Sequence, residues 1–468
     1  MDIKLLRSRA LRNCLVIVAA VTLAWGCSGK AQAPDGDVET AETMELTETA
    51  DPVAITPGAG GSGGTVVVSP GSSIASAVDR APDGARIVIQ AGVYHEQVDI
   101  TKPLTLEGEP GAIIEGDCVR DYGINVAQRR DPETGRPTTR PYDVTIRGLT
   151  VRNVRFSTIW IFHDEDLPQT SAPRNITVDG NTITDFNCTN IPDSSEKYRA
   201  GIGVLYSGSN IRVTNNLIKF RAALAEDAPG QRSYSNGIWF ASRTRNASGG
   251  GHYIAYNRIV GGYDGIGGEV EEDPNGSFDQ DTTIEFNTIV NGNDDGIQVE
   301  GGGENVIVRN NDIALYGTGI ALASPHSGPL RIENNVIHHP RRGVQGNLFC
   351  FKVGRADGSG EAPLSTATSV LTGNVCTADG ADAMDGVKQT DLTLAPIVFR
   401  DNCLQVSRYI YEITYGPTTG LEFDGNTFST TDPERFIKWG SNTTLYRSLE
   451  AFQQATGQEA SGQVGQTC

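Results

Sequence analysis

The sequence predicts an all-β solenoid built from stacked parallel sheets. In nine segments, a short β-branched run leads to an asparagine, and an apolar residue follows two positions later. Between successive asparagines, a Gly-Ile or Gly-Val pair marks the start of another strand. These strands are about five residues long and are joined by corners rather than helices, which excludes doubly wound α/β folds.

The spacing of the asparagines defines the size of the repeat. Consecutive spacings are 35, 41, 30, 24, 24, 39, 28 and 24 residues. The shortest spacing is 24 residues and several spacings are longer, which indicates a coil of constant circumference that carries loops on some turns. Asparagine suits the corner because it tolerates left-handed backbone geometry and because its side chain can bond the asparagine of the next coil. The aligned residues are Asn181, Asn216, Asn257, Asn287, Asn311, Asn335, Asn374, Asn402 and Asn426.

The glycine-led strand is where side chains of different coils can meet. The apolar residue after each glycine should point inward, so the residue two after the glycine should point outward. Aromatic side chains on such a face suit stacking on sugar rings, or they form a local core under a long loop such as 220–234. The expected outward residues are Trp239, Gly267, Gln298, Ala321, Gln345 and Lys388, with Trp160 and Tyr411 at equivalent places in less regular coils.

Five carboxylates fall on two adjacent coils of this strand. Asp264 and Asp295 precede the glycines, Asp294 lies beside them, and Glu269 and Glu300 take the next outward position. Adjacent coils lie about 5 Å apart, so these groups would repel one another without compensation. Either a hard cation such as Ca²⁺ is held among the oxygens, or one carboxyl is protonated and forms the acid pair of glycoside cleavage. The third alternative is that they decorate exposed turns.

Basic side chains follow on the next coils. Arg342 precedes a Gly-Val pair, Lys352 lies in the segment NLFCFKVG, and His326 lies on a nearby turn. Removal of the C5 proton of a uronate demands a base close to a cation, so this neighbourhood suits that chemistry.

Both ends of the repeat region carry a predicted helix. Residues 72–81 read as a short helix before the coils, and residues 448–458 as a helix after them. A solenoid must be capped because open sheet edges would template aggregation. We expect the β-helix over residues 65–430 and a C-terminal cap over residues 431–468.

The entry segment AGVYHEQVDITKPLTLEG, the asparagine corners and the terminal FQQATG helix resemble right-handed β-helix proteins of the pectin lyase-like superfamily. The likeness covers about residues 65–458. It implies a single-stranded right-handed parallel β-helix with helical caps at both ends. That fold carries lyases, hydrolases, esterases, epimerases and non-enzymes, so it does not select an activity by itself.

The run NDDGIQVEG and the later FKVG are similar to calcium-dependent pectate lyases of this fold, in which an Asp-Asp-Gly-x-Asp run binds Ca²⁺ and a later Phe-Lys supplies the base. The resemblance implies that Asp264, Asp294 and Asp295 ligate calcium and that Lys352 is the base. The chain departs from the family at Gln298, where the family has another Asp, and Lys352 lies about one coil further on.

We therefore expect a polysaccharide lyase that cleaves a uronate-containing glycan by β-elimination, with Lys352 or Arg342 taking the proton. One alternative is a polygalacturonase-like hydrolase that uses Glu269 and Glu300. The other is a non-catalytic glycan-binding or surface structural β-helix. The expected substrate-binding residues are Trp160, Trp239, Gln298, His326 and Tyr411.

The N-terminus predicts export. Four basic residues precede an apolar run over residues 14–25, and the ending LAWGC resembles a bacterial lipoprotein signal over residues 1–26, with Cys27 lipidated. An ordinary secretory signal is the alternative. Residues 27–64 are acidic and then glycine-rich, which predicts a disordered tether. The expected location is the bacterial cell envelope, as an outer-membrane lipoprotein or a secreted protein, with membrane contact only through the lipid.

Charge and cysteine content limit the partners. The formal net charge is −19, which argues against nucleic acid because phosphate binding needs a basic surface. We expect a monomer whose partner is an extracellular polysaccharide. Six cysteines follow the predicted signal, and an oxidising compartment allows up to three disulfides whose pairing the spacing does not reveal. They are Cys118, Cys188, Cys350, Cys376, Cys403 and Cys468.

Overall fold

The computed structural model divides the chain into two compact units, residues 1–57 and 58–468, and all described residues belong to the second. The predicted signal peptide, Cys27 and all but the last two residues of the predicted tether lie outside the described residues. The structure describes residues 63–129, 131–139, 141–164, 167, 169–188, 199–205, 208–220, 235–241, 249–268, 278, 280–299, 303–322, 328–338, 348–354, 368–378, 384–390, 396–465 and 468.

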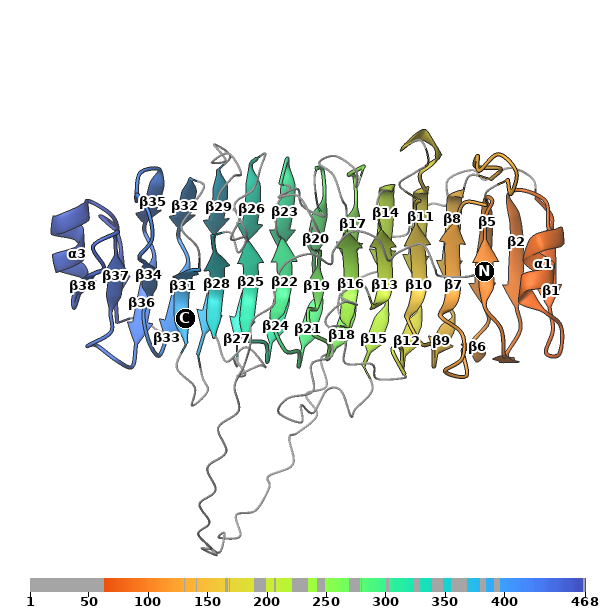
Figure 1. The fold of residues 1–468 in the computed structure, drawn as a ribbon. Coiled ribbons are helices and arrows are strands. Elements are labelled where there is room, and N and C mark those ends of the chain that lie inside the picture. Colours follow the sequence, from red (N-terminus) through yellow and green to blue (C-terminus); the bar gives the residue numbers. More distant parts are fainter. Residues whose placement is uncertain are drawn as a thin grey trace, which may run out of the picture. The chain divides into compact units, whose positions relative to one another are not determined.

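Three sheets of 13 strands each form the second unit, and successive coils contribute one strand to each sheet (Figure 1). Every pairing between named strands is parallel except that of β37 with β38. The predicted parallel β-helix is therefore confirmed. No helix in the described part of the chain is long and apolar enough to cross a membrane.

Sheet A contains β1 (Thr65–Val68), β2 (Ala85–Ile89), β5 (Leu104–Gly108), β8 (Tyr142–Arg147), β11 (Arg174–Asp179), β14 (Ser209–Thr214), β17 (Tyr253–Ala255), β20 (Thr283–Glu285), β23 (Val306–Arg309), β26 (Leu330–Glu333), β29 (Ser369–Thr372), β32 (Ile397–Arg400) and β35 (Leu421–Asp424).

Sheet B contains β3 (Gly92–Tyr94), β6 (Ala112–Glu115), β9 (Thr150–Arg152), β12 (Thr182–Thr184), β15 (Leu217–Lys219), β18 (Arg258–Val260), β21 (Thr288–Val290), β24 (Asp312–Ala314), β27 (Val336–His338), β30 (Val375–Thr377), β33 (Cys403–Val406), β36 (Thr427–Thr430) and β39 (Gln463–Val464).

Sheet C holds the glycine-led strands. It contains β4 (Val98–Ile100), β7 (Tyr122–Ala127), β10 (Ser157–Phe162), β13 (Ala200–Leu205), β16 (Asn236–Ala241), β19 (Ile266–Gly267), β22 (Asp295–Val299), β25 (Thr318–Leu322), β28 (Phe349–Val353), β31 (Asp385–Gln389), β34 (Tyr411–Ile413), β37 (Ile437–Trp439) and β38 (Thr444–Tyr446).

The nine aligned asparagines form one continuous buried ladder. Asn311 is typical: its amide donates to Asn335 Oδ1 at 2.9 Å and to the carbonyl of Ile284 at 3.0 Å. Its own Oδ1 accepts from both the backbone and the side chain of Asn287. The predicted bonding between stacked asparagines is confirmed from Asn181 through Asn426. These bonds fix which residue of one coil lies over which residue of the next.

The left-handed conformation does not belong to the ladder asparagines, and this part of the prediction was wrong. In each coil, the residue that precedes the ladder asparagine adopts this conformation. Asn310 has φ 53°, and Tyr256 and Phe286 have similar values. The reason is geometric, because the left-handed residue turns the chain and leaves the next asparagine with its N–H directed at the neighbouring asparagine's Oδ1.

Glycine in the Gly-Ile pair is required by close packing. A Cβ on Gly296 would lie 2.3 Å from Ile313 and 2.8 Å from the carbonyl of Gly319. The following residues, such as Ile266, Ile297 and Ile320, are fully buried in the core, as predicted. The glycine therefore lets sheet C turn tightly against the isoleucines of sheet B.

Both predicted cap helices are present. Helix α1 (Ile74–Arg80) starts at the N-cap Ser73, and helix α3 (Leu449–Thr456) runs from the N-cap Ser448 to Gly457, which is left-handed. Residues after 430 also add strands, since β37 extends sheet C and β39 extends sheet B. A short 3₁₀ turn, η1 (Gln169–Ser171), lies in one of the loops.

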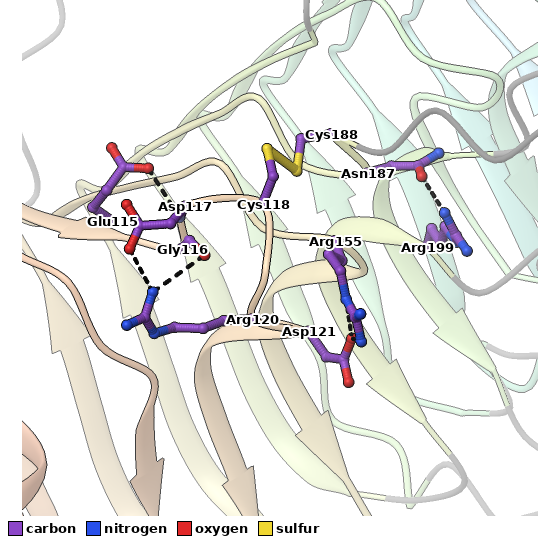
Figure 2. Close-up of a disulfide and its surroundings, with 10 residues drawn as sticks. All are labelled: Glu115, Gly116, Asp117, Cys118, Arg120, Asp121, Arg155, Asn187, Cys188 and Arg199. Carbon is purple, nitrogen blue, oxygen red and sulfur yellow. Dashed lines mark hydrogen bonds and ion pairs between the residues drawn. A yellow bond between two sulfur atoms is a disulfide. The ribbon is translucent and has the colours of Figure 1, made fainter.

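Six cysteines form three disulfides, which the sequence allowed without giving their pairing. Cys118 and Cys188 follow β6 and β12, two coils apart on sheet B, and Figure 2 shows their bond beside the ion pairs Asp117–Arg120 and Asp121–Arg155. The other pairs are Cys350–Cys376, between sheets C and B inside the core, and Cys403–Cys468, which ties the C-terminus to sheet B.

Replacing a ladder asparagine should destabilise the fold strongly. Asn311→Ala removes a 1 % exposed amide and leaves its acceptors and donors without partners, so we expect a loss of about 3 kcal/mol. Asn125→Ala removes a single bond to Asp99 at a half-buried position, and should cost less than about 1 kcal/mol. Urea unfolding of both variants measures this, and equal losses would contradict the role assigned to the ladder.

Candidate functional site

The strand registers place the predicted outward residues in one row across sheet C. Trp160 pairs with Gly203, Gly203 with Trp239, and Trp239 with Gly267. Further along the stack, the row continues through Gln298, Ala321, Lys352, Lys388, Glu412 and Lys438. We call these ten residues the outward row. The sequence-based alternation is therefore correct for Trp160, Trp239, Gly267, Gln298, Ala321 and Lys388.

Two members of the predicted row differ. Gln345 was expected to be outward in the coil that contains β28, but it lies outside the described residues. The outward residue of that coil is Lys352. Tyr411 was assigned to the wrong side: it pairs with Val387, is fully buried, and packs at ring distances of 4.8–5.9 Å from Phe399 and Phe423.

The cause of this error is a shift of phase. No glycine precedes Tyr411 to set the alternation, and a slip of one residue moves every side chain to the opposite face. Glu412 is the outward residue of that coil, which makes it a site residue that the sequence analysis missed.

The two tryptophans form a local core on the outer face of sheet C. Trp160 is 5 % exposed and stacks on Tyr122 with a centroid distance of 5.5 Å, and Trp239 is 2 % exposed. Phe156 packs edge-on against Trp160 at 5.1 Å. Of the two alternatives, the structure therefore shows the local core and not an exposed aromatic face, because burial of these large apolar surfaces against one another is favourable. Apart from Phe220, the loop 220–234 lies outside the described residues.

Asp264, Asp294 and Asp295 meet at the entry of β19 and β22. One carboxylate oxygen from each lies within 4.8 Å of the others. Asp264 and Asp295 are 3 % and 1 % exposed, and the Asp295 N–H donates to Asp264 Oδ1 at 3.1 Å. Burial, and then the neighbouring charges of Asp294 and Asp295, raise the pKa of Asp264 well above its usual range. The predicted stacking of these acids is present.

Lys352 reaches this cluster from two coils away. Its Nζ lies 2.9 Å from Asp295 Oδ2, and its side chain is 21 % exposed. The coil between them contributes Ala321 to the outward row, and that methyl group leaves room for the lysine to lie back across β25. The extra coil that separates Lys352 from the family pattern is therefore spanned by the length of its side chain.

The oxygens of this site suit a hard divalent cation. Asp295 Oδ1 is buried and has no hydrogen-bond partner among the described residues, and the same is true of Gln298 Oε1. Gln298 Oε1 lies against Gly267, where it would be 3.2 Å from an added Cβ. Ca²⁺ binds carboxylate and amide oxygens, so Asp264, Asp294 and Asp295 fit it, and Gln298 offers an uncharged oxygen nearby on the same strand as Asp295.

Four predicted site residues lie outside the described residues: Glu269, Glu300, His326 and Arg342. The structure thus locates one of the two candidate bases, Lys352. The sequence analysis missed Asp385, Arg408, Glu412 and Lys438. A signal for the first was present, because the run Asp-Gly-Val-Lys at 385–388 repeats the Asp-Gly-Ile-Gln run at 295–298.

No protein-family model and no curated protein matches this sequence. Among solved structures, an alginate lyase from Paenibacillus sp. str. FPU-7 is similar with 15% identity and a TM-score of 0.38, over 80% of this chain and 99% of that one. The A-module of Azotobacter vinelandii mannuronan C-5 epimerase AlgE4 has 13% identity and a TM-score of 0.47, over 77% and 95%. A pectate lyase has 11% identity and a TM-score of 0.39, over 86% and 88%.

Three parallel sheets of 13 strands decide the architecture. The fold is a parallel β-helix. Identities of 15% or less concern the fold alone, so the chemistry of this β-helix has to be argued from its own residues.

Asp264→Asn should change how stability depends on pH. The folded state holds a proton on Asp264 more tightly than the unfolded state does, so folding loses stability as pH rises through the raised pKa. With chelator present, Asp264→Asn should match the wild type near about pH 4 and exceed its stability at neutral pH.

The matched control is Asp83→Asn, at an exposed turn position, which should follow the wild type at every pH. Urea unfolding across the pH range supplies both comparisons. A difference between Asp264→Asn and the wild type that stays constant with pH would show that burial and the neighbouring carboxylates do not raise the pKa of Asp264.

Proposed function

We propose that this β-helix acts on an extracellular polysaccharide, and that it cleaves a uronate-containing glycan by β-elimination. The observation that carries the proposal is the contact of Lys352 Nζ with Asp295 Oδ2 at 2.9 Å, inside a cluster of three carboxylates. Such an elimination needs a base close to positive charge that stabilises the substrate's enolate.

Lys352 would take the C5 proton of the uronate. The electron pair of that C–H bond forms the C4=C5 double bond, and the C4–O bond breaks with its electrons going to the leaving sugar oxygen, which then takes a proton. Ca²⁺ held by Asp264, Asp294 and Asp295 would supply the positive charge that stabilises the developing enolate.

In the resting state the ion pair holds Lys352 Nζ against Asp295 Oδ2. The lysine becomes a base once Asp295 no longer serves as its counter-ion. Asp295 would thus position the lysine in the resting state and then release it for proton transfer.

A lipid anchor at Cys27 would place this activity at the bacterial cell envelope, where polysaccharides are accessible. The basic residues and the apolar run that precede the sequence LAWGC, together with the acidic segment that follows, support this part of the proposal.

Lys352→Arg should abolish cleavage while retaining the ion pair with Asp295. Arginine holds its proton much more tightly than lysine does, so it is the weaker base at this position, and we expect a loss of about 10²–10⁴-fold in kcat. The measurement is the ultraviolet absorbance of unsaturated uronate on pectate, alginate and glycosaminoglycans. Lys219→Met, an exposed lysine on sheet B, is the control and should keep full activity. Near-normal activity of Lys352→Arg would exclude Lys352 as the base, and silence of the wild type on every polymer would exclude the lyase.

Calcium should stabilise the protein and be required for cleavage. At about 100 times its Kd, a ligand that binds only the folded state adds about 2.7 kcal/mol to the free energy of unfolding. We expect that gain for the wild type and for Asp83→Asn, and little of it for Asp294→Asn or Asp295→Asn. Unfolding curves with chelator and with added Ca²⁺ measure it independently of activity. An identical Ca²⁺ response in all four proteins would show that these aspartates do not bind the ion.

A hydrolase is the second candidate, because two buried carboxyls lie close together. Oxygens of Asp264 and Asp295 lie within 4.8 Å of one another, and a pair of neighbouring carboxyls would supply the acid and the nucleophile or base of a glycosidase. A hydrolase would release reducing sugar without the unsaturated product. A glycan binder would show neither, and its binding would survive alanine at Asp294, Asp295 and Lys352.

A further inference from the structure

A second charged cluster lies on sheet C, beyond Lys352 in the direction of the C-terminus. Lys388 follows Lys352 in the outward row, Glu412 follows Lys388, and Lys438 follows Glu412. Arg408 joins them from the segment before β34. We call Lys388, Arg408 and Lys438 the cationic strip. Their side chains are 19 %, 33 % and 25 % exposed, so all three reach the surface.

One buried carboxylate holds the strip together. Glu412 accepts from Lys388, from Arg408 Nη2 at 2.9 Å and from Lys438 Nζ at 3.1 Å. Although burial opposes it, hydrogen bonds from Lys388 and Lys438 lower the pKa of Glu412 to about 2, so Glu412 is ionised at all physiological pH values. Its fixed charge keeps three mutually repelling cations side by side.

The aromatic ring of Tyr409 restricts two of these cations further. Lys438 Nζ lies 4.3 Å from the ring centroid, and the Arg408 guanidinium carbon lies 5.2 Å from it. Cation–π contacts of this kind hold a charged group over the ring while its donors still face solvent. The strip is therefore ordered before any ligand arrives, which lowers the entropic cost of binding.

The described charges leave this neighbourhood positive. Three cations face Glu412 and Asp385, and burial raises the pKa of Asp385 to about 6. Asp385 is 1 % exposed, and its Oδ1 forms an ion pair with Arg408 Nε at 3.1 Å. These contacts use Nε and Nη2 of Arg408, and its other terminal nitrogen has no hydrogen-bond partner among the described residues. A positive strip on a chain of net charge −19 marks a place for an anion.

We infer that the cationic strip binds a carboxylate of the polysaccharide, at a sugar remote from the bond that is cleaved. Adjacent coils lie about 5 Å apart, so the backbone of Lys438 is about 15 Å along the row from that of Lys352. A single sugar cannot span this distance, whereas one polymer chain can. The inference rests on the proposed function only in taking the same polymer to pass over Lys352. Arg408 and the two lysines offer the planar and point-charge donors that carboxylates accept.

Removing the carboxylate of Glu412 tests whether the cationic strip binds an anion or is only a structural network of ion pairs. Glu412→Gln keeps the size and the acceptor oxygen and makes the strip more positive by one charge. We expect it to bind oligogalacturonate about three- to tenfold more tightly, whereas Lys438→Gln should bind it about three- to tenfold more weakly. Neither should change binding of a neutral galactan oligomer.

Calorimetric titration in a Lys352→Arg background measures these affinities without cleavage, and Lys219→Gln is the matched control on sheet B. Melting curves establish whether each variant is folded. If Lys438→Gln does not fold, the affinity of Glu412→Gln alone tests the inference. Affinities within twofold of one another for all variants, or preference for a sulfated over a carboxylated oligomer, would overturn the inference. Binding that depends on the strip, when the protein with Lys352 intact forms no unsaturated product, would refute the lyase and keep the carboxylate subsite. Cleavage that is equally fast in all the strip variants would refute the carboxylate subsite and keep the lyase.

Discussion

Bonding between successive asparagines is the constraint on which the rest of the structure depends. Each ladder amide is buried and satisfies both its neighbour and a backbone carbonyl of the coil before it, so a coil cannot slip without breaking several bonds at once. Because register is fixed in this way, residues far apart in sequence meet predictably. Lys352 and Asp295 are 57 positions apart and still lie in contact.

The ladder also has to end, and the C-terminal region supplies its last acceptor. Glu459 is fully buried and accepts from the Asn426 amide at 2.7 Å and from the Tyr411 hydroxyl at 2.6 Å. The segment that follows α3 thus closes the chain of hydrogen bonds, while α3 itself packs Phe452 on the final aromatic layer beside Trp439. The inward orientation of Tyr411 follows from this role.

Sheet C separates opposite charges along one face. Around Asp264 and Asp295 the carboxylates outnumber the single described lysine, so that neighbourhood suits a cation. Around Glu412 three cations surround one carboxylate that stays ionised, so that neighbourhood suits an anion. Buried charge is costly unless it is paired, and here each centre has a partner: Lys352 for Asp295, and three cations for Glu412. Among the described residues, Asp295 Oδ1 has no hydrogen-bond partner. That asymmetry of charge is why we place the proposed function on sheet C.

The sequence by itself determined the coil, the asparagine corners, the cap helices and the meeting of Asp264, Asp294 and Asp295, because these follow from local periodicity and from a constant repeat. Tertiary structure decided the disulfide partners, the burial of Trp160 and Trp239, and the reach of Lys352 across Ala321. It also decided that Tyr411 points inward and Glu412 outward. Without a glycine at the start of this strand, the sequence did not determine which of the alternating residues faces the core. Periodicity states which residues share a face. Only packing states which of them are covered, and which long side chains bridge from one coil to another.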